Sequence, residues 1–343
     1  IPDNAVDSIT MSGGANPLFG LNTLGGSLIV NMKNGFTYQG SNLEVNTGSF
    51  DRHTTTIETG NNNGFFGYYG SLQYFEEDGW RESSESDSLN FYGSLSWRTE
   101  ASSLNLNYQY GDSNLKGNGA SPVELLSYDR QMIFTGPDIT ENDMQMLSMD
   151  FQHSFSDALS FSASVNHREN KTDSFNGDGS EFAICELGGM ERLLEGLEED
   201  DLKEIGFEDE DVCANQFANA DALEGFLNLT ASTLDSDDEF ELNGFDDDEL
   251  SGSGILSDEG INNLSNRNQK SSGADFQWTL TNNLLGKSNQ LIAGLSYFVG
   301  ESNFNSVLEL AKMNPLTRLT FGLGTGTFVD EEATSISTET ATS

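Results

Sequence analysis

Basic residues, proline and long apolar runs are all scarce in this chain of 343 residues. Only 15 Lys and Arg stand against 56 Asp and Glu, so the clustered cations that bind phosphate are missing and a nucleic-acid partner is excluded. The same shortage disfavours peripheral binding to anionic lipid. No apolar run reaches the roughly 18 residues of a membrane-crossing helix, and 35% hydrophobic residues is low for a soluble core of this size.

Glycine and aromatic residues are plentiful instead. The chain has 36 Gly, 23 Phe and 9 Tyr against 5 Pro, which suits many strands joined by tight turns and suits a helical enzyme poorly. The net charge of -41 is compatible with a solvated extracellular surface, with cation binding or with a high-salt habitat. The chain begins at Ile1 without a signal peptide, which we interpret as truncation or processing.

Alternation of apolar and polar residues recurs along the chain. It is clearest after Ser103, where Leu104, Leu106 and Tyr108 alternate with polar neighbours. Alternation over about ten residues is the pattern of a transmembrane β-strand, with one face in lipid and the other toward a polar lumen. Nine segments are predicted to be such strands: 43–50, 52–60, 64–75, 88–97, 103–111, 146–155, 158–167, 272–281 and 290–300, with a tenth at 334–343.

The connections between these segments alternate in length after the first hairpin. Those at 61–64, 98–102, 156–157 and 282–289 are short, whereas those at 76–86, 112–143, 170–270 and from 301 onward are longer. Outer-membrane barrels sort their connections this way, with tight turns at one rim and long loops at the other. A soluble sandwich has no reason to do so, and the membrane barrel is the better interpretation.

The first 36 residues carry a more specific signal. A strand at 6–11 leads to the turn Gly13-Gly14, then to Leu18-Phe19-Gly20, a Gly25-Gly26 turn and a strand ending in Lys33. This series resembles the end of the plug domain of TonB-dependent outer-membrane receptors. Glycine allows the sharp turns and close backbone contacts of a compact plug, so Gly13, Gly14, Gly20, Gly25 and Gly26 are predicted plug turns. One departure is that Met11-Ser12 stands where the family has a basic residue before the turn.

The resemblance implies an all-β chain with the C-terminal end of a plug in 1–36 and the N-terminal part of a barrel in 37–343. Such a barrel closes with about 22 strands, of which nine or ten are present, so we expect a fragment that cannot transport alone. The family implies active uptake of a scarce ligand, most commonly a ferric siderophore, through the Gram-negative outer membrane. It implies as partners the lipid, the ligand and the TonB complex, which binds a coupling segment (the TonB box) outside this chain.

The loop predicted at 170–270 is densely acidic, as solvated or disordered segments are. Within it, 188–207 has leucines near helical spacing, which predicts a short amphipathic helix that packs the loop onto itself. Cys185 and Cys213 flank this segment, and outside the cytoplasm two cysteines in one loop are most simply a disulfide.

Calcium binding is a second hypothesis for the acidic loop. Oxygen ligands are dense around Asp235, Asp237, Asp246 and Asp248. The spacing does not fit an EF-hand, because Phe240 occupies the position that needs Gly. Crowded carboxylates of this kind usually stay hydrated, so a specific calcium site is a weaker interpretation of this segment than a solvated loop. We expect no other cofactor.

Signatures of catalysis are missing from the sequence. It contains no nucleophile elbow, phosphate loop or CxxC, and its histidines, His53, His153 and His167, stand singly in strand-like segments. We therefore expect no enzyme. The alternative to a receptor is a soluble or surface-anchored all-β adhesin with calcium-bound acidic loops. The ligand, the source and the oligomeric state are not encoded in any motif of this segment.

Overall fold

The computed structural model describes residues 2–14, 25–179, 182–187, 190–195, 259–284, 287–314, 316–328 and 336–342. Nearly all of these residues are in strands, and the helical elements are the 3-10 turn η1 (Asp3–Ala5) and the one-and-a-half-turn helix α1 (Val123–Tyr128). Among the described residues, no helix is both long and apolar enough to cross a membrane.

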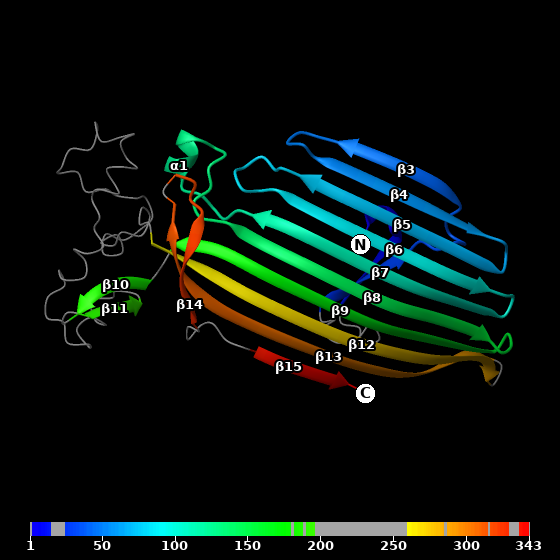
Figure 1. Ribbon diagram of the computed structural model, residues 1–343. Helices are drawn as coiled ribbons and strands as arrows, with labels where there is room; N and C mark the ends of the chain where they lie inside the picture. The colour runs from blue at the N-terminus through cyan, green and yellow to red at the C-terminus, as the bar shows by residue number, and fades with distance from the viewer. Residues whose placement is uncertain are drawn as a thin grey trace.

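One antiparallel sheet of eleven strands dominates the molecule (Figure 1). Strands β3 to β9 pair in sequence order, β12 pairs with β9, β13 pairs with β12, and both β14 and β15 pair with β13. The bounds are β3 (Gly40–Thr47), β4 (His53–Asn62), β5 (Phe66–Glu77), β6 (Ser86–Arg98), β7 (Ser102–Gly117), β8 (Asp138–Ser154), β9 (Leu159–Gly179), β12 (Glu259–Leu284), β13 (Lys287–Met313), β14 (Thr320–Phe328) and β15 (Ile336–Thr342).

Each of the nine predicted strand segments overlaps one strand of this sheet, in the predicted order, and the tenth segment contains β15. Strand β14 was not predicted. Its sequence, Thr320–Phe328, reads TFGLGTGTF, and the regular glycines remove the side chains on which an alternation pattern depends.

The later strands are much longer than the roughly ten residues that alternation predicts. Strands β8, β9, β12 and β13 contain 17, 21, 26 and 27 residues. Strand β9 therefore continues to Gly179 and β12 begins at Glu259, inside the segment 170–270 that was predicted to be loop. In these extensions most side chains on both faces are polar, with Phe175, Ile261 and Leu264 as exceptions. The backbone pairing therefore continues beyond the point where the alternation of the sequence stops.

The predicted helix at 188–207 is wrong over its first part. Strand β11 (Met190–Glu195) pairs antiparallel with β10 (Phe182–Leu187) in a separate two-stranded sheet. A short run with several apolar residues fits either a helix or a strand by its spacing alone, and pairing with β10 gives the backbone amides partners. The rest of that prediction lies outside the described residues.

The sheet has two different faces. The inner face is defined here as the one covered by the N-terminal segment, which contains β1 (Val6–Gly13) and β2 (Gly26–Met32) and lies on the far side of the sheet in Figure 1. The outer face carries apolar side chains that remain exposed on neighbouring strands: Leu43, Ile57, Leu72, Leu95, Leu106, Leu147, Val165, Leu291 and Leu295. Polar side chains inward and apolar side chains outward is the arrangement of a membrane β-barrel wall.

Candidate functional site: the inner face of the wall and its strand tips

The N-terminal segment is a hairpin closed by glycines. Strands β1 and β2 pair from Val6–Met32 to Gly13–Gly26, and the Gly14 amide donates to the Gly25 carbonyl at 3.4 Å. Gly14 has φ 88° and Gly26 has φ 140°, and a Cβ on Gly26 would lie 2.6 Å from the Ser12 carbonyl oxygen. Four of the five predicted plug glycines therefore lie together at the end of this hairpin, while Gly20 lies outside the described residues.

A small core joins the hairpin to the sheet. Ala5 is fully buried against Tyr69 and Tyr92, and the rings of these two tyrosines lie 5.9 Å apart. The Ser71 hydroxyl donates to the Asn4 side-chain oxygen at 2.9 Å. Because Tyr69 and Ser71 of β5 and Tyr92 of β6 are inward-facing residues, these contacts fix the N-terminal segment to the inner face.

An ion pair extends this attachment toward the start of the wall. Lys33 Nζ lies 3.2 Å from Glu58 Oε2, and the Tyr69 hydroxyl donates to the same oxygen at 2.7 Å. The Glu58 side chain is only 7% exposed, so both hydrogen bonds are needed to offset the desolvation of its charge. The Lys33 ammonium also lies 4.7 Å from the centre of the Tyr38 ring.

The passage from the hairpin into β3 runs through Gly35. A Cβ at this position would lie 2.4 Å from the Tyr68 amide nitrogen and 2.6 Å from the Asn61 carbonyl oxygen. The Asn62 side chain donates to the Gly35 carbonyl at 2.6 Å. Only glycine fits this contact.

A second packed region, which we call the strand-tip cluster, lies at the far ends of the long strands. It is formed by the connection 118–137, residues 316–319 and the ends of β9, β12 and β13 (Figure 1). Its buried apolar side chains are Leu125, Ile133, Ile261, Leu308, Ala311 and Met313. The cluster therefore closes the tips with a core of its own, separate from the core at Ala5.

Arg318 holds the two connections of the strand-tip cluster together. Its Nε donates to the Phe134 carbonyl at 2.8 Å, its guanidinium lies 5.3 Å from the Phe134 ring centre, and the residue is 4% exposed. Burial lowers the pKa of this guanidinium from its usual value. Next to it, the Thr320 amide donates to the Gly136 carbonyl at 2.7 Å.

Two carboxyl groups near the tips have shifted pKa values. Burial, and secondly the charge of Asp178, raises the pKa of Asp138 above its ordinary value. A hydrogen bond to its own backbone, together with Lys116 at 3.0 Å, lowers the pKa of Glu85. The tips therefore contain one carboxyl group that resists ionisation and one that favours it.

Between the two packed regions, the inner face is open and polar. The ladder register joins Tyr92 to Gln109, Gln109 to Met146, Met146 to Arg168, Arg168 to Ser271 and Ser271 to Gly300. Directly paired residues point to the same side of a sheet. Since Tyr92 is part of the inner core, Arg168 also lies on the inner face.

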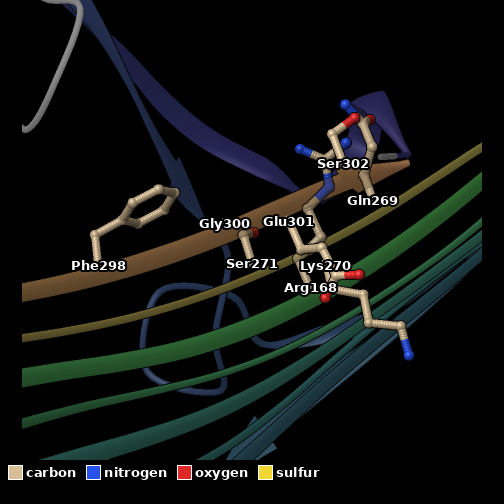
Figure 2. A pocket seen from close by; sticks show the side chains of 8 residues that line it. All are labelled: Arg168, Gln269, Lys270, Ser271, Phe298, Gly300, Glu301 and Ser302. Carbon is tan, nitrogen blue, oxygen red and sulfur yellow. The ribbon is translucent and has the colours of Figure 1, made fainter. Parts of the chain in front are cut away.

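A shallow cavity of about 250 Å³ surrounds Arg168 (Figure 2). Its walls come from β9, β12 and β13. The residues at the cavity are Arg168, Gln269, Lys270, Ser271, Phe298, Gly300, Glu301 and Ser302. Figure 2 shows the Arg168 and Phe298 side chains on one side of the sheet and the Lys270 ammonium on the other.

A larger cavity, of about 630 Å³, lies near the short turns. It is lined by Leu95, Leu104 and Leu106 together with Trp97. Leu95 and Leu106 are exposed residues of the apolar outer face, which a bilayer would cover. We therefore assign the candidate ligand site to the smaller, polar cavity of the inner face.

The predicted residues of the acidic loop lie mostly outside the described residues. This applies to Cys213 and to Asp235, Asp237, Asp246 and Asp248, so the calcium hypothesis stays a prediction. Cys185 lies in β10 opposite Arg192, and the disulfide also stays a prediction. The sequence analysis did not single out Arg168 or Phe298, because only the register reveals that they lie on the same face of the sheet, on the strands at either side of β12.

Comparison with known proteins identifies the class of fold. A scan of protein-family models and a search of curated proteins both find no match. Among solved structures, the fold is similar to that of outer-membrane receptors.

Three of these structures illustrate the match. The ferripyoverdine receptor of the outer membrane of Pseudomonas aeruginosa gives a TM-score of 0.57 at 12% identity, over 88% of this chain and 33% of that receptor. The pyoverdine receptor FpvA from P. aeruginosa PAO1 gives 0.59 at 14% identity, over 88% and 36%. The ferric preacinetobactin receptor BauA from Acinetobacter baumannii gives 0.53 at 11% identity, over 86% and 36%. The chain thus spans about a third of the length of each.

Proposed function

We propose that this chain is the plug end and the first part of the barrel wall of a TonB-dependent receptor in a Gram-negative outer membrane. The receptor would take up a ferric siderophore or a similar scarce ligand. The observation that carries the proposal is the two-faced sheet: a glycine-closed hairpin is fixed to its polar inner face, and its outer face is apolar.

The chemistry of the two faces fits this role. The outer face would be buried in lipid, where exposed apolar side chains are favourable and strand pairing leaves no unbonded amide inside the wall. The inner face would line the lumen, with the hairpin occupying it. The strand-tip cluster would lie outside the membrane, where ligands arrive.

Uptake can be tested with radiolabelled ferric chelates in iron-starved cells that produce the full-length receptor to which this chain would belong. We expect the protein in the outer-membrane fraction and chelate accumulation that is lost in matched cells without TonB. Accumulation that is equal with and without TonB would contradict the proposal. A protein that remains soluble without detergent and is stabilised by calcium would instead favour the adhesin alternative.

A further inference from the structure

We propose that the connection 118–137, between β7 and β8, is a single strap that fastens the β5–β6 connection (78–85) to the turn 316–319, and that this strap opens and closes as one unit. Two arginines attach it, Arg81 on one side and Arg318 on the other. The inference describes a conformational device and goes beyond the proposed uptake function.

The strap is closed on itself. Its backbone turns through α1, and the Ser121 hydroxyl donates to the Met132 carbonyl at 3.5 Å, which brings its two limbs together. Between the limbs, the Asp129 amide donates to the Leu125 carbonyl at 3.0 Å. Leu125 and Ile133 are both buried, so each limb contributes an apolar side chain to the core. A loop with close ends that packs its own side chains forms a compact body.

Arg81 holds both limbs from the side of β5. Its guanidinium donates to three oxygens of the strap, the Gly119 carbonyl at 3.0 Å, the Ser121 hydroxyl at 2.6 Å and the Met132 carbonyl at 3.0 Å. The Glu82 amide adds a backbone hydrogen bond to the Gln131 carbonyl at 2.9 Å. One side chain therefore spans the neck of the strap, and the planar fork of a guanidinium is suited to bind several acceptors at once.

The second attachment comes from β14 and the turn before it. Arg318 donates to the Phe134 carbonyl at 2.8 Å, and the Thr320 amide donates to the Gly136 carbonyl at 2.7 Å. These acceptors follow closely after Met132, which accepts from Arg81. Both attachments thus meet on the same short stretch of backbone, 132–136.

This stretch is too short to open in two independent halves. Ile133 lies between the acceptor of Arg81 and the acceptor of Arg318, and it is only 1% exposed. Local openings of a protein expose contiguous segments whose contacts depend on one another. While the strap is closed, the connection 78–85 and the turn 316–319 are therefore fixed to one body, and its opening frees it from both.

Amide hydrogen exchange in the full-length protein that would contain this chain tests the strap. The first variant is Arg81→Ala, with the Thr320 amide as its reporter, and the reciprocal variant is Arg318→Ala, with the Asp129 amide as its reporter. Neither reporter's hydrogen bond involves the substituted arginine. Arg130→Ala is the matched control, because Arg130 lies exposed in the same strap. Unchanged exchange of the paired amides of β6 and β7 shows that each variant is folded.

We expect each arginine variant to accelerate exchange at its distant reporter by roughly tenfold or more, as the loss of hydrogen bonds from a charged donor does. Arg130→Ala should change both reporters by less than about twofold. Acceleration confined to amides beside the substituted arginine would overturn the inference, because the two ends of the strap would then open separately.

No acceleration at either reporter would overturn it as well. If Arg81→Ala also disturbs β6 and β7, the decision rests on Arg318→Ala and its reporter. No ligand enters the measurement, so a negative result leaves the proposed uptake function intact.

Discussion

The two halves of β9 share one backbone ladder and differ in what surrounds their side chains. From 159 to 166 the outward residues are Leu159, Phe161, Ala163 and Val165. From 167 to 179 both faces are polar apart from Phe175, and on the surface Glu169 pairs with Lys270 and Lys171 with Asp173. Pairing with β8 and β12 nevertheless continues without a register shift through both halves.

This difference shows that alternation and strand formation are separate properties. Alternation records that one face meets lipid and the other a polar lumen. Strand pairing itself needs only neighbours whose amides and carbonyls are in register. Where both faces meet water, the strand persists and the alternation disappears.

The largest expected effect comes from placing a charge on the outer face of the sheet at the level of residues 159–166, the lower half of β9. Met149 lies on the outer face of β8, pairs with Val165 of β9 and is exposed, and Met149→Arg should lower the free energy of unfolding in lipid by about 2–4 kcal/mol. Asn268→Arg introduces the same side chain on the exposed upper part of β12 and should change it by less than about 0.5 kcal/mol. Urea unfolding of both variants in lipid vesicles measures the contrast, and equal losses would mean that the upper half also lies in lipid.

Removing the Arg318 side chain from the strand-tip cluster should have a smaller effect on stability, and that effect should be confined to the cluster. Arg318→Ala leaves the Phe134 carbonyl without its donor, which costs about 1–3 kcal/mol locally. We expect faster protease cleavage in the connection 118–137 and unchanged unfolding of the wall. Arg130→Ala is the matched control, because Arg130 lies exposed in the same connection; equal cleavage of the two variants would contradict the role given to Arg318.

The smallest expected effect concerns the pH dependence of the tips. The folded pKa of Asp138 is raised, chiefly by burial, so the stability that its protonated form allows is present at low pH and is lost as the pH rises through that pKa. Asp138→Asn keeps the side chain neutral and should stabilise the cluster at neutral pH by on the order of 0.5 kcal/mol, with no gain at acidic pH. Thermal melts at the two pH values measure this, with Glu141→Gln as the exposed control; a gain that is the same at both pH values would refute the explanation.

The sequence predicted those parts of the fold in which a local pattern has a single physical cause. Leu104, Leu106 and Tyr108 alternate with polar neighbours because they point to the apolar outer face of the sheet, and the glycines of the first hairpin are required by backbone contacts such as that of Gly26 with Ser12. The candidate site could not be predicted in the same way. Arg168 and Phe298 are 130 positions apart, and they share a cavity only because β12, which follows the long acidic connection, pairs between β9 and β13.

The alternation of Arg168 with Glu169, and of Lys270 with Ser271, has a consequence for how this protein can change in evolution. In a strand, adding or deleting one residue exchanges the two faces from that point on, whereas adding or deleting two preserves them. A single-residue insertion between 166 and 168 would turn Glu169 toward the lumen in place of Arg168 and reverse the sign of the charge there, although the composition would hardly change. We therefore expect related sequences to vary in length at this level of the wall by even numbers of residues, and to vary freely in the connections beyond the tips.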